Sequence, residues 1–231
     1  MNLNSLRPLL SWAYLIRIIV VIFGLFLFAT GTIFIYRSQL GLDPWDVLHL
    51  GISLHTPLSF GTASIVVGAI IILFSLFLRV FPGVATVLNM ALIGIFVDME
   101  LHFNWLTGVS TSSLFIRLLI NVAGVAIVGI GSAFYITPQL GTGPRDGLMM
   151  RLHTLTKARI AIVRAVIECS VLVIGFFLGG TVGIGTLIFA FGIGPAVEIS
   201  FSLARRLHLA ELLRVPPIQP APKQKQSALS S

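Results

Sequence analysis

The chain repeats itself with a period of 100 residues. The segment Leu40–Leu48 reappears as Leu140–Leu148, with glycine, proline, aspartate and leucine kept at the same places. The register then holds without a gap, and about 20 positions of 16–98 are identical in 116–198. Such a repeat is the mark of an internal duplication, in which each copy is one structural unit. The fold must therefore build the same arrangement of elements twice.

The composition places both copies in a membrane. Hydrophobic residues make up 56% of the chain and charged residues only 10%, whereas ordinary soluble domains carry about 25% charged residues. The net charge of +7 is concentrated at the edges of apolar segments. This pattern suits the positive-inside rule and anionic lipid headgroups, and it argues against nucleic acid as a partner. The expected partner of most of the surface is the lipid bilayer.

Six segments are long and apolar enough to cross a bilayer as helices, which takes roughly 20 residues each. They are 13–36, 60–80, 83–103, 114–137, 160–179 and 183–204. Two further apolar segments, 43–55 and 143–154, are too short. A helix of about 12 residues reaches only ~18 Å across a hydrocarbon core of ~30 Å. Because each begins with a proline, which favours the first helical position, both are predicted to be short helices, re-entrant or interfacial.

Three spans per copy is an odd number, so the second copy must enter the membrane from the opposite side. The predicted fold class is therefore all-α: a polytopic membrane protein with six transmembrane helices in two inverted three-helix repeats, each with a short helix. On one side of the membrane, lysine and arginine occur at Arg7, at Arg79, in 145–159 and in the C-terminal tail. On the other side the connections carry only Arg37, and 104–113 and 180–183 carry none. This asymmetry places both termini in the cytoplasm. If the short segments crossed as well, the chain would have eight spans and a parallel repeat.

The domain organisation follows from the spans. It comprises a cytoplasmic N-terminus (1–12), a first three-span repeat (13–103), an external loop (104–113), a second three-span repeat (114–204) and a basic cytoplasmic tail (205–231). The proline-, lysine- and glutamine-rich tail cannot pack a core and is expected to be largely disordered. The expected location is the cytoplasmic (inner) membrane.

The repeated Gly-x-x-Pro-x-Asp signature gives the first candidates for a site. Asp43 and Asp46 stand at the start of the first short helix, and Asp146 holds the matching place in the second. In the simpler interpretation they are helix-start residues that accept hydrogen bonds from free amide groups. In the functional interpretation the two helix N-termini face a shared cavity and offer their amides and dipoles to a solute. Trp45 is then an aromatic wall and its counterpart Arg145 favours an anion; otherwise they are an interfacial aromatic and a positive-inside charge.

A charged pair inside the fifth predicted span gives the second set of candidates. Glu168 lies four residues after Arg164, so both occupy one helix face and can pair. A lone charge in the bilayer core is costly, which favours pairing. The pair is either structural or part of a substrate or proton site. Its counterparts Ser64 and Gly68 are uncharged, so such a site would be asymmetric.

Equivalent positions also predict two structural ion pairs between the copies. Arg17 and Arg117 stand near the starts of the first and fourth spans, and Asp98 and Glu198 near the ends of the third and sixth. Each arginine shares a membrane side with the acid of the other copy. We therefore expect the pairs Arg17–Glu198 and Arg117–Asp98, and a double charge reversal should rescue a single one.

The sequence carries no pattern typical of catalysis. The five histidines lack metal-ligand spacing, the lone Cys169 cannot build a Cys-x-x-Cys site, and no phosphate-binding glycine loop occurs. We expect neither an enzyme nor a bound metal or other cofactor.

Several motifs resemble the bacterial YczE/YyaS/YitT-type membrane protein family. They are Gly41–His49 (Gly-Leu-Asp-Pro-Trp-Asp-Val-Leu-His), Asn89–Asp98, Gly141–Leu148 and Gly179–Thr186. The resemblance spans nearly the whole chain, 10–205. It implies a multi-pass cytoplasmic-membrane protein with transport as a candidate role, and it supplies no binding or catalytic residue.

The sequence as a whole favours a small-solute secondary transporter or permease, with a path between the two repeats. The arginine near one short helix makes an anion a candidate solute. The alternative is a non-transporting accessory or scaffold protein that acts through a membrane partner and its basic tail. A homo-oligomer is compatible with either function.

Overall fold

A computed structural model describes residues 12–213 and 215, and the chain is all-helical over these residues. The helices are α1 (Trp12–Ser38), α2 (Pro44–His55), α3 (Phe60–Phe77), α4 (Val84–His102), the 3-10 helix η3 (Thr107–Thr111), α5 (Leu114–Ile136), α6 (Pro144–Thr156), α7 (Ile160–Phe177), α8 (Ile184–Arg206) and α9 (Leu209–Leu212). The six predicted spans are confirmed as α1, α3, α4, α5, α7 and α8, each long and apolar enough to cross a membrane. Most of the predicted N-terminus and tail lies outside the described residues.

The two predicted short helices are confirmed as α2 and α6, of 12 and 13 residues. Asp43 caps α2, because its Oδ1 accepts hydrogen bonds from the amides of Trp45 (3.0 Å) and Asp46 (3.3 Å). The counterpart Gly143 has no side chain with which to cap α6. Both helices have proline at their start, where a missing amide proton costs nothing. Neither is long enough to cross a bilayer, so the eight-span alternative finds no support.

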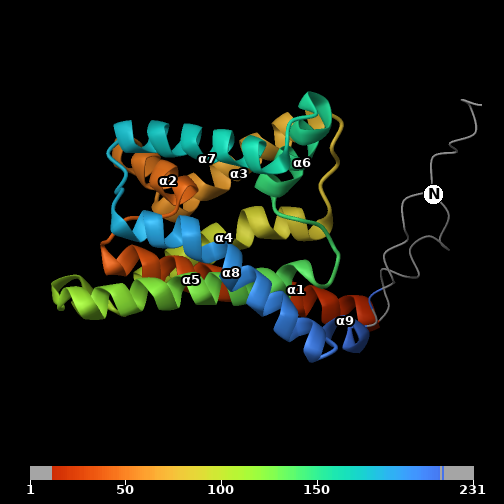
Figure 1. Cartoon of the computed structure of the whole chain (residues 1–231), viewed down its shortest axis with the longest axis horizontal. Helices are drawn as coiled ribbons and strands as arrows, with labels where there is room; N and C mark the ends of the chain where they lie inside the picture. The colour runs from red at the N-terminus through yellow and green to blue at the C-terminus, as the bar shows by residue number, and fades with distance from the viewer. Residues whose placement is uncertain (1–11, 214, 216–231) are drawn as a thin grey trace, which may run out of the picture.

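The two first spans of the copies, α1 and α5, form the most extensive helix pair. A Cβ on Gly24 would lie 2.8 Å from the Gly131 carbonyl oxygen, and one on Gly31 would lie 2.7 Å from the Gly124 carbonyl oxygen. The pairing of 24 with 131 and 31 with 124 means that the helices run antiparallel. Figure 1 shows them side by side along one edge of the bundle. Glycine permits this approach, which is how helices pack where lipid removes the hydrophobic driving force.

The remaining spans are placed around this pair. α4 lies along α1, where Thr30 donates a hydrogen bond to Glu100 (2.8 Å), and α8 lies along α5, where Gly129 meets Ala196. In Figure 1, α4 and α8 lie next to the α1–α5 pair, and α7 runs along the opposite edge. A buried apolar core of α1, α4 and α5 side chains holds these helices together. Large apolar side chains such as Phe77 point outward, as a lipid-facing surface requires.

Contacts in one half recur in the other after a shift of 100 residues. The Leu140 carbonyl accepts a hydrogen bond from the Ala85 amide (3.0 Å), and the Leu40 carbonyl accepts one from the Gly185 amide (2.7 Å). The Gly24–Gly131 and Gly31–Gly124 contacts exchange in the same way. Each half therefore places the connection before its short helix against the last span of the other half.

Each short helix begins inside the bundle and runs outward beside a span of the other half. α2 packs on the end of α7, where a Cβ on Gly175 would lie 2.5 Å from the Leu48 amide nitrogen. α6 packs on the end of α3, where Arg151 donates a hydrogen bond to the Leu78 carbonyl (2.9 Å). The first residues of α2 and α6 consequently meet near the centre of the molecule.

Candidate functional site

A cavity of about 240 Å³ lies between the two halves, where the short helices begin. Residues of α1 through α8 contribute to its wall. Its polar lining consists of Asp43, His49, Ser64, Asn89, Ser132, Tyr135, Arg145, Asp146, Arg164 and Glu168. Most of the charged residues predicted as a solute path are thus brought together at one place, although they come from both halves of the chain.

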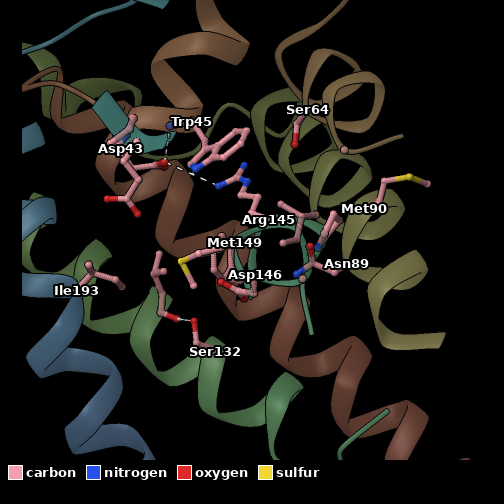
Figure 2. A pocket seen from close by; sticks show the side chains of 18 of the residues that line it. Asp43, Trp45, Ser64, Asn89, Met90, Ser132, Arg145, Asp146, Met149 and Ile193 are labelled. Atoms are coloured by element: carbon pink, nitrogen blue, oxygen red, sulfur yellow. Dashed lines mark hydrogen bonds and ion pairs between the residues drawn. The ribbon is translucent and has the colours of Figure 1, made fainter. Parts of the chain in front are cut away.

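The N-termini of α2 and α6 meet through Arg145. One of its guanidinium nitrogens, Nη1, lies 4.0 Å from Asp43 Oδ1, and its Cζ lies 4.7 Å from the centroid of a Trp45 ring. Figure 2 shows the Arg145 guanidinium against the Trp45 ring, with a dashed line to Asp43. An arginine over a tryptophan face is a cation–π contact. The Asp43 side chain is nearly buried, whereas the Arg145 side chain is 34% exposed and borders the open space.

A histidine that the sequence analysis passed over forms a second polar group of the wall. His49 is 1% exposed, and its Nδ1 lies 3.0 Å from Asp46 Oδ1, one turn earlier on α2. Its Nε2 is buried and has no hydrogen-bond partner among the described residues. A carboxylate on Nδ1 favours the tautomer in which Nε2 carries a lone pair. His49 then offers an acceptor at the cavity, and Asp46 orients it from outside the lining.

On the α6 side, three polar atoms surround Gly143. A Cβ added there would lie 3.5 Å from each of Asn89 Oδ1, Asp146 Oδ2 and Tyr135 Oη. These are ordinary contact distances, so the missing side chain of Gly143 leaves usable space. Asp146 and Asn89 lie close to Arg145 in Figure 2. The start of α6 therefore supplies both the polar space around Gly143 and Arg145, whose side chain reaches across to Asp43 and Trp45 at the start of α2.

The predicted pair on α7 is present. Arg164 Nε donates a hydrogen bond to Glu168 Oε1 at 2.8 Å, and both residues line the cavity. Their side chains are 50% and 34% exposed, so the pair stands at the rim. The sequence placed these residues on one helix face, and the structure adds that this face borders the cavity.

Burial changes the proton affinity of the groups that surround the short helices. It raises the pKa of Asp43 well above the ordinary aspartate value, and the neighbouring Asp46 raises it further. Burial also raises the pKa of Asp146, against the opposing charge of Arg145. It lowers the pKa of His49 to about 3, with the positive charge of Arg145 as the next cause. The acids are thus driven toward their neutral forms, and the histidine is held neutral.

Acid should destabilise the protein through His49. An unfolded histidine takes up a proton near pH 6.5 and the folded one only near pH 3, so protonation favours the unfolded state as pH falls below about 6.5. The loss at about pH 5 amounts to ~2 kcal/mol. The melting temperature in detergent, compared between neutral pH and about pH 5, measures it.

The variant His49→Gln should lose this part of the pH dependence, whereas the exposed His55→Gln should keep it. Asp43 acts in the opposite sense, because its raised pKa favours the folded state as pH falls, and it is present in every variant. The difference between the variants isolates the histidine. An equal acid-induced drop in both variants would remove His49 from this role.

The predicted ion pair between Arg117 and Asp98 is wrong. Arg117 donates hydrogen bonds to the carbonyls of Ser38 (2.8 Å) and Gln39 (2.6 Å), where α1 ends. Unpaired carbonyls and the negative end of the helix dipole suit a cation. Asp98 instead accepts hydrogen bonds at the N-terminus of α3. Each of these charged side chains therefore interacts with a helix end and not with the opposite charge.

The predicted pair Arg17–Glu198 is not formed either. Arg17 Nε donates a hydrogen bond to the Leu213 carbonyl at 3.2 Å, and Glu198 is exposed on α8. Both predictions relied on shared membrane sides alone. A shared membrane side does not determine which helix ends an arginine can reach. The packing of α3, α8 and α9 determines it.

Comparisons with known proteins agree with the motifs of the two copies. Residues 15–201 match a family described as a family of unknown function (DUF6198). An uncharacterised protein of Haemophilus influenzae is 34% identical over 81% of this chain and 84% of its own. In Bacillus subtilis, the uncharacterised membrane protein YczE is 34% identical over 87% of this chain and 88% of its own. The uncharacterised protein YyaS of that organism is 26% identical over 71% and 82%. No solved structure matches this chain.

Proposed function

This chain belongs to the DUF6198 family of membrane proteins, as its resemblance to YczE and YyaS predicted, and we propose that it is a permease for a small polar solute. The observation that carries the proposal is the polar cavity at which the N-termini of α2 and α6 meet. Ionisable groups inside a membrane bundle are costly, and a purely structural bundle has no need to gather them around open space. Secondary transporters place their sites at such a meeting of broken or short helices between repeats.

The contacts between the halves support an inverted repeat. α1 and α5 are equivalent in the duplication and run antiparallel, with contacts that exchange under the 100-residue shift. A two-fold axis perpendicular to these helices would produce this pattern. If the helices cross the membrane, that axis lies in its plane, and basic residues gather at the end of the bundle where α1 begins and α8 ends.

The chemistry of the wall favours a small anion that also carries a hydrogen-bond donor. Arg145 and the free amides at the start of α6 attract negative charge, whereas Asp43 already occupies the amides at the start of α2. His49 and Asp146 offer acceptors to a hydroxyl or ammonium group. The cavity of about 240 Å³ has room for roughly eight water molecules. A short hydroxy or amino carboxylate fits these requirements.

Solute flux into proteoliposomes tests the proposal. Vesicles that contain the purified protein should take up lactate or serine, the first probes of this class, faster than protein-free vesicles. Arg145→Ala should abolish the excess flux because it removes the positive charge of the cavity. Lys157→Gln, which removes a charge outside the cavity, should leave it unchanged.

Flux that persists in the Arg145→Ala protein would contradict the proposed site. The accessory function is favoured instead if no short carboxylate or amino acid moves at all, and if a chain that ends at residue 213 cannot replace the full chain in cells that lack this gene.

A further inference from the structure

The two halves differ at the contact between their last two spans, α3–α4 in the first half and α7–α8 in the second; each contact is called a seam here. In the first half α3 packs closely on α4: a Cβ on Gly61 would collide with the Gly94 carbonyl oxygen, and one on Gly94 would lie 2.6 Å from Ile65 Cγ1. The matching position in the second half is Gly194 on α8. A Cβ there would meet nothing within 4 Å. The α3–α4 seam is closed, and the α7–α8 seam is open.

A set of hydrogen bonds, called a latch here, joins α4 to the first turn of α3 at the closed seam. Asp98 on α4 accepts hydrogen bonds from the Ser59 hydroxyl and from the Gly61 amide (2.8 Å), at the first turn of α3. Its counterpart Glu198 on α8 is exposed and makes no hydrogen bond or ion pair with the described residues. The counterpart of Ser59 is Arg159, the N-cap of α7, which has no side-chain cap. In the second half, the residues at the two latch positions are Glu198 and Arg159, and they are not in contact.

The sequence explains why this seam packs less tightly than its counterpart. Ala161 replaces Gly61, and its methyl group would collide with the backbone of α8 if α7 approached as closely as two glycines allow. Pro195 replaces Ile95 inside α8, and a proline in a helix removes a hydrogen bond and bends the helix. In Figure 1, α8 diverges from α7 toward the end of the bundle where α8 ends.

The open seam leads to the cavity. Arg164 and Glu168 on α7, and Ile193 and Val197 on α8, line the cavity from the two sides of the seam. The half-exposed Arg164 side chain shows that this wall is incomplete. The α3–α4 latch and the α7–α8 opening lie at opposite ends of the bundle, because α4 ends beside the end of α1 and α8 ends near its start.

We propose that the two seams are the two gates of the solute path, with the α3–α4 gate closed and the α7–α8 gate open in this structure. Closure of the second gate brings Glu198 to Arg159 and to the free amides at the start of α7, as Asp98 is brought to α3. An acid at a helix N-terminus and an opposite charge beside it both stabilise that closed state. This inference rests on the proposed permease function, since it names the groups that admit and retain the solute.

Cysteine cross-linking across the open seam tests the proposal. The variant carries Ala161→Cys and Gly194→Cys in a Cys169→Ser background, and the control carries Ile162→Cys and Ile199→Cys, two outward positions of the same helices. Oxidation in proteoliposomes should cross-link the first pair and not the second. It should stop lactate or serine flux, and reduction should restore that flux.

Absence of the cross-link in a protein that transports, or full flux through the cross-linked protein, would contradict the proposed gate but not the proposed permease function. A cross-link in a protein that moves no solute would support closure of the seam and contradict the proposed permease function. A charge exchange provides the second measurement. Arg159→Glu and Glu198→Arg should each slow flux several-fold, and the double variant should recover it; recovery is absent if the two residues never meet.

Discussion

Gly31→Leu should leave little folded protein, because it forces α1 and α5 apart. A Cβ at this position would lie 2.7 Å from the Gly124 carbonyl oxygen and 2.8 Å from the Val128 amide nitrogen, and neither backbone atom can turn away as a side chain can. Overpacking of a tight contact costs up to about 3 kcal/mol, and two helices that meet backbone to backbone can relieve it only by moving apart. The yield of monodisperse protein and its melting temperature in detergent measure the effect.

Gly108→Leu is the control for this variant. A Cβ on Gly108 would meet no atom within 4 Å, so the same change in side-chain volume should have little effect. Equal melting temperatures for the Gly31 and Gly108 variants would show that the α1–α5 contact is not what holds the halves together.

Gly143→Asn should leave the protein stable and remove its solute flux. The backbone of Gly143 has φ −58°, which any residue can adopt, and a Cβ there makes only ordinary contacts at 3.5 Å. Asparagine is a better N-cap than glycine by only a few tenths of a kcal/mol, so it should not destabilise α6. Its side chain would occupy the space between Asn89 and Asp146, and we expect flux to fall at least to one tenth, roughly a 1.4 kcal/mol effect on binding.

Melting temperature and flux, measured on one preparation, separate these two effects. Gly108→Asn adds the same side chain away from the cavity and should keep full flux. Full flux in the Gly143→Asn protein would mean that the space around Gly143 is not on the solute path.

The ends of the spans were predictable to within about three residues, because the length and apolarity of a membrane helix depend only on its own residues. The predicted span 160–179 is α7, Ile160–Phe177, and the predicted short helix 43–55 is α2, Pro44–His55. Proline and an acidic residue predicted the first turn of α2, and the structure has its first turn at these residues. Local signals of this kind require no knowledge of neighbouring helices.

The site was predictable in part. The functional interpretation of Asp43 and Arg145 anticipated that the two helix starts meet, since the duplication implied equivalent positions for both. His49 gave no usable signal, because a histidine one turn after an aspartate is common on helices and its burial depends on α3 and α7. The ion pairs of Arg117 and Asp98 failed for a related reason: helix ends compete with opposite charges, and only the packing decides which is within reach.

The reciprocal contact between α1 and α5 has a consequence for the origin of the chain. A surface in which position 24 meets 131 and position 31 meets 124 is self-complementary, so two identical three-span chains could form it as an isologous dimer. The members of such a dimer would lie in opposite orientations in one bilayer, a dual-topology pair. Fusion of the two genes fixes one orientation for each copy and frees each to diverge. Trp45 against Arg145 and Gly61 against Ala161 are differences that a homodimer could not have held.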